Sequence, residues 1–309
     1  MSLVVGTYPV DPTDPEDSRR FYAALDRSGL YGALELPADA GGARTVPAAV
    51  PPGWSLVVTA IPGTMRQMAA DPTFGLASTD EEGRRRALDF AGVLREDVAR
   101  LTREGRRTLA VQLHSAPRGL GSGAALQRSL TELAAWDWSG AHLTVEHCDA
   151  LLPDHAPEKG FLPLESEIEA VLRTAEATGV DVGITVNWAR SVIETRRPQE
   201  AERHVRRAAE DGVLAGVMFS SCAPVATEFG YPWIDAHLPS REVAGAPPAS
   251  LLTATHVRDC LAASGSPLYA GLKVDVRPRG LAPEELAARI TTLARIIAVA
   301  AQVPAVADR

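Results

Sequence analysis

Four side chains that can move protons or bind metals stand in a row in the sequence: Glu146, His147, Cys148 and Asp149. The residues just before them alternate apolar and polar side chains, which is typical of a β-strand with one apolar face. A long polar loop follows as far as Gly160, and such loops often carry functional residues. Carboxylates and imidazoles at a strand end suit general acid–base catalysis or metal binding. This strand end is therefore the first candidate for a functional site.

The elements that position these residues follow from the spacing of apolar residues. Eight strands are predicted, at residues 3–8, 31–37, 54–61, 108–114, 142–146, 182–187, 213–220 and 268–274. Helices are predicted at residues 14–29, 79–105, 124–136, 164–179, 250–265 and 283–303, with a further helical stretch that ends near Gly212. The helix at 79–105 begins with a capping-box pattern at Thr79. The connection after the second strand is rich in Gly, Pro and Ala and has room for at most a short helix.

Eight strand–helix units in 309 residues match the count and length of a (β/α)₈ TIM barrel. A doubly wound sheet is the main alternative, but it usually has fewer strands and a glycine fingerprint after the first one. Here the first strand runs into Gly6-Thr-Tyr-Pro-Val, which lacks that fingerprint. Neither a linker nor a change in composition divides the chain. The sequence therefore predicts an α/β protein with a single TIM-barrel domain over residues 1–309.

In the predicted strands, apolar residues facing the helices alternate with residues facing the barrel axis. The axis-facing residues begin small and become polar at the C-terminal ends of the strands. The polar ones are Glu35, His114, Glu146, Asn187, Ser220 and Lys273. A barrel built for stability alone would not gather six polar groups, because each must be desolvated and then hydrogen-bonded. Since active sites of TIM barrels lie at this face, we predict that these residues form the functional site.

Single residues also have structural interpretations. His114 alone is compatible with a hydrogen-bonded core histidine, and Lys273 with the counter-ion of a buried Glu146. His147 points away from the axis by alternation, which favours a supporting role over direct chemistry. Cys148 is better explained as a small core residue than as a nucleophile, because the neighbouring carboxylate would raise its pKa.

Two further segments carry candidate residues. The loop after the seventh strand places Asp235 and His237 two residues apart, with Trp233 nearby. A carboxylate and an imidazole at this spacing can share a metal or relay a proton, and a tryptophan can stack on a sugar face. An ordered lid is the alternative interpretation of this loop. Arg190 and Glu194, after the sixth strand, are either substrate contacts or the first turns of a solvated helix.

Composition excludes several classes of protein. The formal charge of −8 and the pI near 5.4 argue against nucleic acid or an anionic membrane as the main partner. No apolar run approaches the roughly 18 residues that a membrane helix needs, and the N-terminus has no secretion-signal pattern. Three cysteines without CxxC spacing argue against a disulfide framework. We expect a soluble cytoplasmic protein.

The chain resembles the xylose isomerase-like superfamily of sugar isomerases and epimerases, through Glu146, Asn187 with its following helix, and Lys273. The segments EHCDALLPDHAPEKGFLPLESEI and TVNWARSVIET are similar to the DUF4862 family of this superfamily. The resemblance implies a small carbohydrate substrate, with a homodimer left open. In metal-dependent members it also implies a divalent cation (Mn, Mg, Co or Zn) held by a strand-five Glu, a strand-six Asp, a strand-seven His and a strand-eight Glu. This sequence keeps Glu146, but the other positions are Asn187, Ser220 and Lys273, and Lys273 would repel a cation.

Two mechanisms of isomerisation or epimerisation remain open from the sequence. In the first, Glu146 with His114, Asp235 or His237 rebuilds a metal site. In the second, no metal takes part: Lys273 stabilises an enediolate, Glu146 is the general base, and His114 or His237 is the acid. Predicted substrate contacts are Glu35, Asn187, Arg190, Ser220, Trp233 and Asp235.

Two other functions are alternatives. Lys273 could form a Schiff base in an aldolase or lyase, or the barrel could bind carbohydrate without catalysis. Phosphorylated substrates are disfavoured, because no glycine-rich phosphate loop follows the seventh strand.

Overall fold

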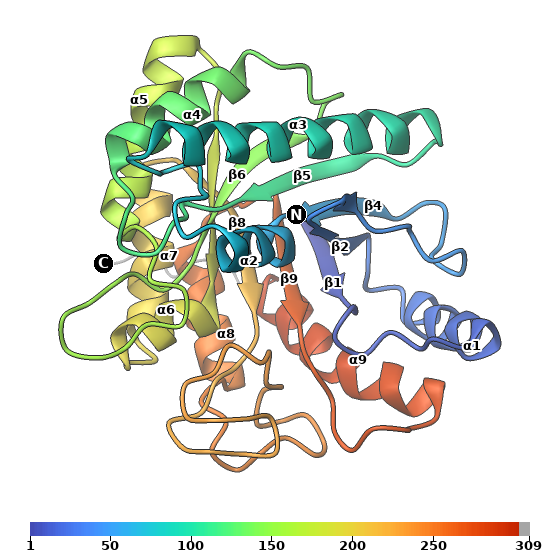
Figure 1. The fold of residues 1–309 in the computed structure, drawn as a ribbon. Helices are drawn as coiled ribbons and strands as arrows, with labels where there is room; N and C mark the ends of the chain where they lie inside the picture. Colours follow the sequence, from blue (N-terminus) through green and yellow to red (C-terminus); the bar gives the residue numbers. More distant parts are fainter. Residues whose placement is uncertain (303–309) are drawn as a thin grey trace.

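Eight parallel strands close into a barrel in the computed structural model, which describes residues 1–302 (Figure 1). In chain order they are β1 (Ser2–Gly6), β2 (Ala33–Asp39), β4 (Ser55–Thr59), β5 (Thr108–Leu113), β6 (His142–His147), β7 (Gly183–Asn187), β8 (Leu214–Phe219) and β9 (Tyr269–Lys273). Each strand pairs with the next, and β1 pairs with both β2 and β9, which closes the ring. The predicted TIM barrel is therefore confirmed.

Helices cover the outside of the barrel (Figure 1). Within residues 1–302 they are α1 (Pro15–Arg27), α2 (Ile61–Ala70), α3 (Glu81–Arg103), α4 (Gly123–Ala134), α5 (Leu164–Thr178), α6 (Trp188–Thr195), α7 (Glu200–Glu210), α8 (Ala254–Ala263) and α9 (Pro283–Ala300). A two-residue strand, β3 (Gly42–Ala43), pairs antiparallel with the end of β2. No helix in this part of the chain is long and apolar enough to cross a membrane.

Several predicted boundaries are wrong for local reasons. The third strand does not continue to Ile61, which instead begins α2 with a proline in its first turn, a position that suits proline. The N-cap of α3 is Asp80 rather than Thr79, and the Asp80 carboxylate accepts a hydrogen bond from the Gly83 amide at 2.7 Å. The helical stretch after the sixth strand is two helices, because Arg196 adopts a left-handed conformation (φ 58°) that ends α6. The predicted end of the last helix at residue 303 lies outside the described residues.

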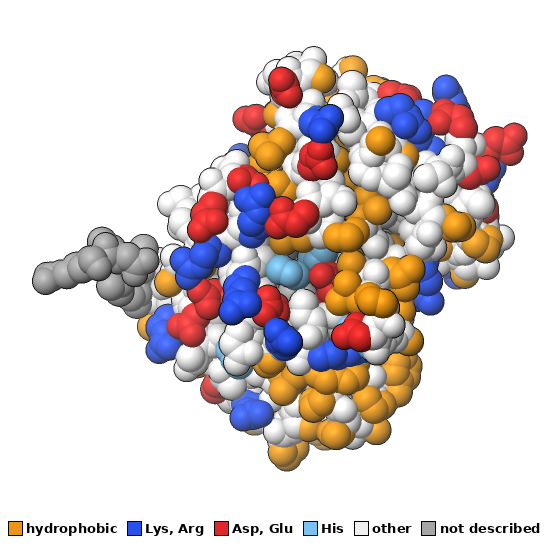
Figure 2. Space-filling model, turned by 90° about the vertical axis from the view of Figure 1, so that its left-hand side faces the viewer, with side chains coloured by type: hydrophobic (Ala, Val, Ile, Leu, Met, Phe, Trp, Pro, Cys, Tyr) orange, Lys and Arg blue, Asp and Glu red, His pale blue; other side chains and the backbone are white. Residues whose placement is uncertain are grey.

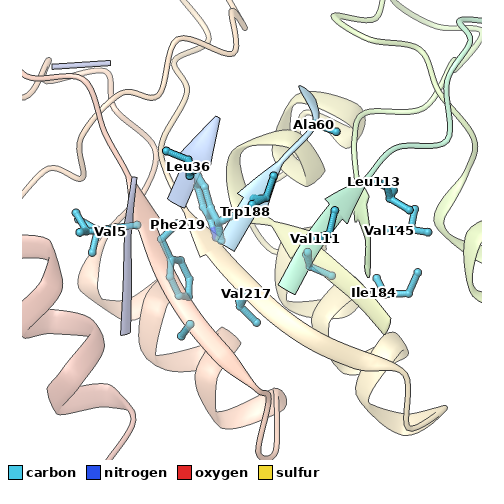
Figure 3. Close-up of a cluster of buried hydrophobic side chains, with 14 of the residues drawn as sticks. Val5, Leu36, Ala60, Val111, Leu113, Val145, Ile184, Trp188, Val217 and Phe219 are labelled. Carbon is cyan, nitrogen blue, oxygen red and sulfur yellow. The ribbon is translucent and has the colours of Figure 1, made fainter. Parts of the chain in front are cut away.

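Alternation along the strands separates two layers of core, as the sequence predicts. Outward side chains such as Val111, Ile184 and Val217 belong to the large cluster beneath the helices (Figure 3). Inward side chains such as Val4 and Met218 form a separate cluster inside the barrel. Leu109 departs from this pattern. Alternation with Val111 and Leu113 would make it face outward, but it belongs to the inner cluster, where the register between β4 and β5 shifts.

Tyr269 fills the inside of the barrel below the functional face. Its wholly buried ring places the hydroxyl 3.1 Å from Gln112 Nε2 and 2.6 Å from Thr185 Oγ1. Gly216 lies against this ring, and a Cβ at that position would overlap it. The small inward residues predicted for the lower strands thus leave room for one large aromatic side chain, which forms a floor beneath the polar residues.

Replacing Gly216 with alanine should destabilise the barrel by about 1–3 kcal/mol, because overpacking forces the ring or the strand to move. Urea unfolding would measure the change. Gly53→Ala is the control, since nothing lies within 4 Å of a Cβ at Gly53. Equal losses in the two variants would contradict the tight fit around Tyr269.

His147 ties β6 to the helices on the outer side of the barrel. Its Nδ1 lies 2.7 Å from Glu167 of α5, and its Nε2 lies 3.0 Å from Glu194 of α6. Burial alone would lower the pKa of His147, but the two carboxylates raise it from 6.5 to about 10. Glu194 also accepts the Ala150 amide at 2.8 Å. A charged imidazolium therefore fixes the start of the loop after β6 and the orientation of α6.

This clamp predicts a pH-dependent contribution to stability. Because the pKa of His147 is higher in the folded protein than 6.5, its stabilisation is complete below about pH 6.5 and is lost as the pH rises towards 10. His147→Gln should lower the free energy of unfolding by about 3–5 kcal/mol near pH 6, since it leaves two buried carboxylates without their cation. The difference from wild type should shrink by pH 10.

Urea unfolding at several pH values would test this. His155→Gln is the control, because that imidazole pairs with the exposed Asp154. A His147→Gln deficit that does not change with pH would contradict a charged clamp.

Candidate functional site

The six predicted polar residues lie at the C-terminal mouth of the barrel, and all are buried. Glu35, Glu146, Asn187 and Lys273 are within strands, while His114 and Ser220 immediately follow β5 and β8. Arg190 joins them from the first turn of α6, and the β8–α8 loop brings Asp235 and His237. The exposed fractions of Glu146, Asn187 and Lys273 are 0%, so the mouth is covered.

Glu146 is held on both oxygens. Its Oε2 lies 2.7 Å from Arg190 Nη1 and 3.0 Å from His114 Nε2, and its Oε1 accepts from Asn187 Nδ2 at 3.2 Å. Burial alone would raise the pKa of Glu146, but Arg190 and Lys273 outweigh it and hold the pKa well below its usual range. Burial lowers the pKa of His114 to about 4, so His114 is neutral and donates from Nε2. Glu146 is therefore ionised and held in position by hydrogen bonds on both oxygens. Its counter-ion is Arg190, not Lys273 as in the structural interpretation of the sequence.

Arg190 links the barrel to the loop that covers it. Its Nε donates to Asp235 Oδ2 at 3.0 Å, and Lys159 Nζ donates to the same oxygen at 2.9 Å. Burial disfavours the Asp235 carboxylate, but Lys159 and Arg190 hold its pKa well below the usual range. His237 lies beside Asp235, with Nδ1 and Oδ1 3.4 Å apart. Two cations thus fix Asp235 over the mouth.

Lys273 and Glu35 form a second, simpler pair. Lys273 Nζ donates to Glu35 Oε1 at 3.1 Å, and both side chains are wholly buried. The ammonium also lies 5.5 Å from the centre of the Tyr8 ring, a distance at which cation and ring attract. Burial would lower the pKa of Lys273, but Glu35, Tyr8 and Glu146 raise it. The raised pKa favours the ammonium form of Lys273 at neutral pH.

The β8–α8 loop closes the mouth. Tyr231 donates to Glu158 at 2.6 Å, and the Arg196 guanidinium lies 4.5 Å from the centre of the Trp233 ring. That contact occupies one face of the ring predicted to stack on a sugar. Trp233 and His237 have φ values of 65° and 55°, a region that side chains other than glycine adopt at a cost. Figure 2 shows a largely apolar surface at the lower end, where Figure 1 places this loop. A ligand reaches the buried residues only if the loop moves.

Several polar atoms at the mouth have no hydrogen-bond partner among residues 1–302. His114 Nδ1, Asp235 Oδ1 and His237 Nδ1 are among them. Four more come from the inward ends of strands and are Glu35 Oε2, Thr59 Oγ1, Asn187 Oδ1 and Ser220 Oγ. Buried polar atoms normally find partners. Because all four can accept hydrogen bonds, the arrangement suits a ligand that supplies several hydroxyl groups.

Sequence reasoning missed three residues of the mouth: Tyr8, Thr59 and Lys159. Alternation from Val4 and Gly6 would have placed Tyr8 on the axis, and alternation from Val57 would have placed Thr59 there. Lys159 lies in an irregular loop, where periodicity says nothing. A compositional signal did exist, because Lys159 and Lys273 are the two lysines of the chain, and the structure brings both to the mouth.

The predicted metal ligands Glu146, Asp235 and His237 do not fit a divalent cation. Arg190 stands between the two carboxylates, with a nitrogen within 3.0 Å of each. A cation placed there would meet the charges of Arg190 and Lys159, which repel it. Across residues 1–302, no group of three or more His, Cys, Asp and Glu side chains is arranged to hold a metal. The guanidinium takes the central place that a metal would need.

Solved structures share this fold at low sequence identity. A D-psicose 3-epimerase from Clostridium cellulolyticum H10, determined with D-tagatose, is 13% identical, with a TM-score of 0.55 over 97% of this chain and 96% of that one. A xylose isomerase domain-containing protein from Salmonella typhimurium LT2 is 10% identical, with a TM-score of 0.58 over 96% of this chain and 97% of that one. These likenesses show the xylose isomerase-like TIM-barrel fold.

Closer similarity exists at the level of sequence. The uncharacterized protein STM3670 of Salmonella typhimurium is 33% identical over 287 residues, which is 88% of each chain. The family model described as a domain of unknown function, DUF4862, matches residues 4–292. The chain therefore belongs to the DUF4862 family.

Proposed function

We propose that this protein is a sugar isomerase or epimerase that moves a proton next to a carbonyl group of a small carbohydrate or sugar derivative. The observation that carries the proposal is the buried Lys273–Glu35 pair, surrounded by acceptor atoms that lack partners among residues 1–302. A fixed ammonium can stabilise the oxygen of an enediolate, and a neighbouring carboxylate can take the proton. The xylose isomerase-like fold supports this assignment.

The chemistry of the mouth favours an uncharged, polyhydroxylated substrate. Arg190, Lys159 and Lys273 each have a carboxylate partner already. A phosphate would therefore have to displace one of these pairs. Hydroxyl groups, in contrast, can donate to Glu35, Asn187 and Ser220 without breaking an ion pair.

The Schiff-base alternative receives no support from the geometry. A lysine that attacks a carbonyl must be a neutral amine, which requires a lowered pKa. The pKa of Lys273 is instead raised by its carboxylate neighbours. A non-catalytic binding protein remains the alternative of another class, and turnover separates it from an isomerase.

The first test is proton exchange with solvent. Purified protein, incubated in D₂O with chelator and a panel of ketoses and aldoses, should introduce deuterium next to the carbonyl of at least one sugar, as followed by ¹H NMR. Lys273→Met should slow this exchange by about 10²–10³-fold, because it removes the charge that stabilises the enediolate. Arg258→Met, at an exposed ion pair, is the control. Binding without exchange would support the carbohydrate-binding alternative instead.

Borohydride provides an independent test of the lyase alternative. We expect no covalent sugar adduct on reduction, since Lys273 stays protonated. Mass spectrometry is decisive here because an adduct could form on one of only two lysines. Trapping at Lys273 that disappears in Lys273→Met would contradict the isomerase proposal and favour a lyase.

A further inference from the structure

The mouth holds two wholly buried carboxylates, Glu35 and Glu146, with different surroundings. Glu146 receives three contacts, from Arg190, His114 and Asn187. Within residues 1–302, Glu35 has one hydrogen-bond partner, Lys273, and its Oε2 has none. The carboxylate predicted from the sequence as the base is thus the one whose oxygens are occupied.

We propose that Glu35, rather than Glu146, takes the proton from the substrate, and that Glu146 is a positioning residue for Arg190, His114 and Asn187. This inference rests on the proposed proton-transfer function. A base must offer an oxygen within hydrogen-bond reach of the proton it removes, and Glu35 Oε2 is such an oxygen.

Gly6 of β1 lies directly beside the free oxygen of Glu35. A Cβ at Gly6 would lie 2.6 Å from Glu35 Oε2 and 3.0 Å from Lys273 Cβ. Gly6 therefore lets the main chain of β1 pack closely beside this carboxylate, where any side chain would collide with Oε2. Of the two carboxylates, Glu35 is the one with an oxygen that has no hydrogen-bond partner within residues 1–302.

Charge movement also favours Glu35. As the substrate C–H bond breaks, its electron pair forms the C=C bond of the enediolate, the carbonyl π electrons move onto oxygen, and Glu35 gains the proton. Negative charge thus passes from Glu35 to a substrate oxygen, and Lys273 can contact both. Return of the proton to the neighbouring carbon, with the hydroxyl proton passing to the first oxygen, gives the isomer.

Protonation of Glu146 would have a larger cost. It would leave the buried Arg190 guanidinium with Asp235 as its one remaining carboxylate partner within residues 1–302, and removing one partner of a buried ion pair is strongly destabilising. The pKa shifts of the two carboxylates also favour Glu35 as the group that takes up a proton, because the pKa of Glu146 is lowered and that of Glu35 is raised. Burial raises the pKa of Glu35, as does Glu146, while Lys273 and Arg190 lower it by less. Tyr8 is neutral near pH 7, since burial raises its pKa to about 12.

A substrate-free experiment can test the ionisation of Glu35. Protein labelled with ¹⁵N-lysine should give two side-chain signals, which Lys159→Met assigns, because the chain has two lysines. The Lys273 signal should titrate with a midpoint above 4.5, the ordinary pKa of a glutamate, and Glu35→Gln should abolish the titration. A titration that persists in Glu35→Gln but disappears in Glu146→Gln would overturn the assignment.

Exchange kinetics with an active sugar supply the second readout. Glu35→Gln should lower kcat by about 10²–10⁴-fold, the usual contribution of a general base, with a small change in KM. Glu146→Gln should retain turnover with a raised KM, and the acid limb of its kcat/KM profile should move to lower pH, because an anion near Glu35 is lost. Glu284→Gln, at an exposed ion pair with Arg20 outside the mouth, is the control.

The outcomes separate two kinds of failure. Exchange by wild type that survives in Glu35→Gln would overturn the role of Glu35 while leaving the proposed function intact. If the wild type exchanges no proton with any sugar of the panel, the proposed function is refuted, and neither carboxylate acts as a base.

Discussion

The contact of Arg190 with Glu146 and Asp235 is the constraint on which the mouth of this barrel depends. One guanidinium links a strand, a helix and the covering loop, all away from water. The helix that carries Arg190 is held a second time on its outer side, where His147 meets Glu194. Two consecutive residues of β6, Glu146 and His147, thus pair with two residues of α6 that are one helical turn apart, Arg190 and Glu194. The strand residue is the anion in the first pair and the cation in the second. A shift of α6 would break both buried ion pairs.

This arrangement changes how a barrel of this fold can do its chemistry. Where the resemblance implies a metal cage, Arg190 and Lys159 supply fixed positive charge that holds the covering loop, and in the proposed reaction Lys273 supplies charge beside the reacting group. Fixed charges in a dry site stabilise a developing anion without much reorganisation. The proposed roles of Glu146 as a positioning residue and Glu35 as the base rest on how many hydrogen-bond donors each carboxylate receives.

Much of this could be predicted from period-two alternation, which places Glu35, Asn187 and Lys273 at one face because the barrel's geometry repeats in every strand. Ser220 is predicted there only from its position at the end of the seventh strand. What alternation cannot specify is pairing. One interpretation of the sequence pairs Lys273 with Glu146, whereas in the structure Arg190 of the following helix pairs with Glu146 and Lys273 pairs with Glu35. Alternation also says nothing about irregular segments such as the loop that carries Lys159. It does not predict the helix that begins at Ile61 or the helix end at Arg196, which depend on local sequence and backbone conformation.

The most direct test of the account is elemental analysis of protein purified without a chelator or a metal-binding tag, alongside Glu146→Gln. If paired ammonium and guanidinium groups occupy the place of a metal, the wild type should contain far less than one equivalent of Mn, Mg, Co or Zn and should keep its exchange activity in chelator. One equivalent of a divalent metal that is lost in Glu146→Gln, together with loss of activity in chelator, would contradict it.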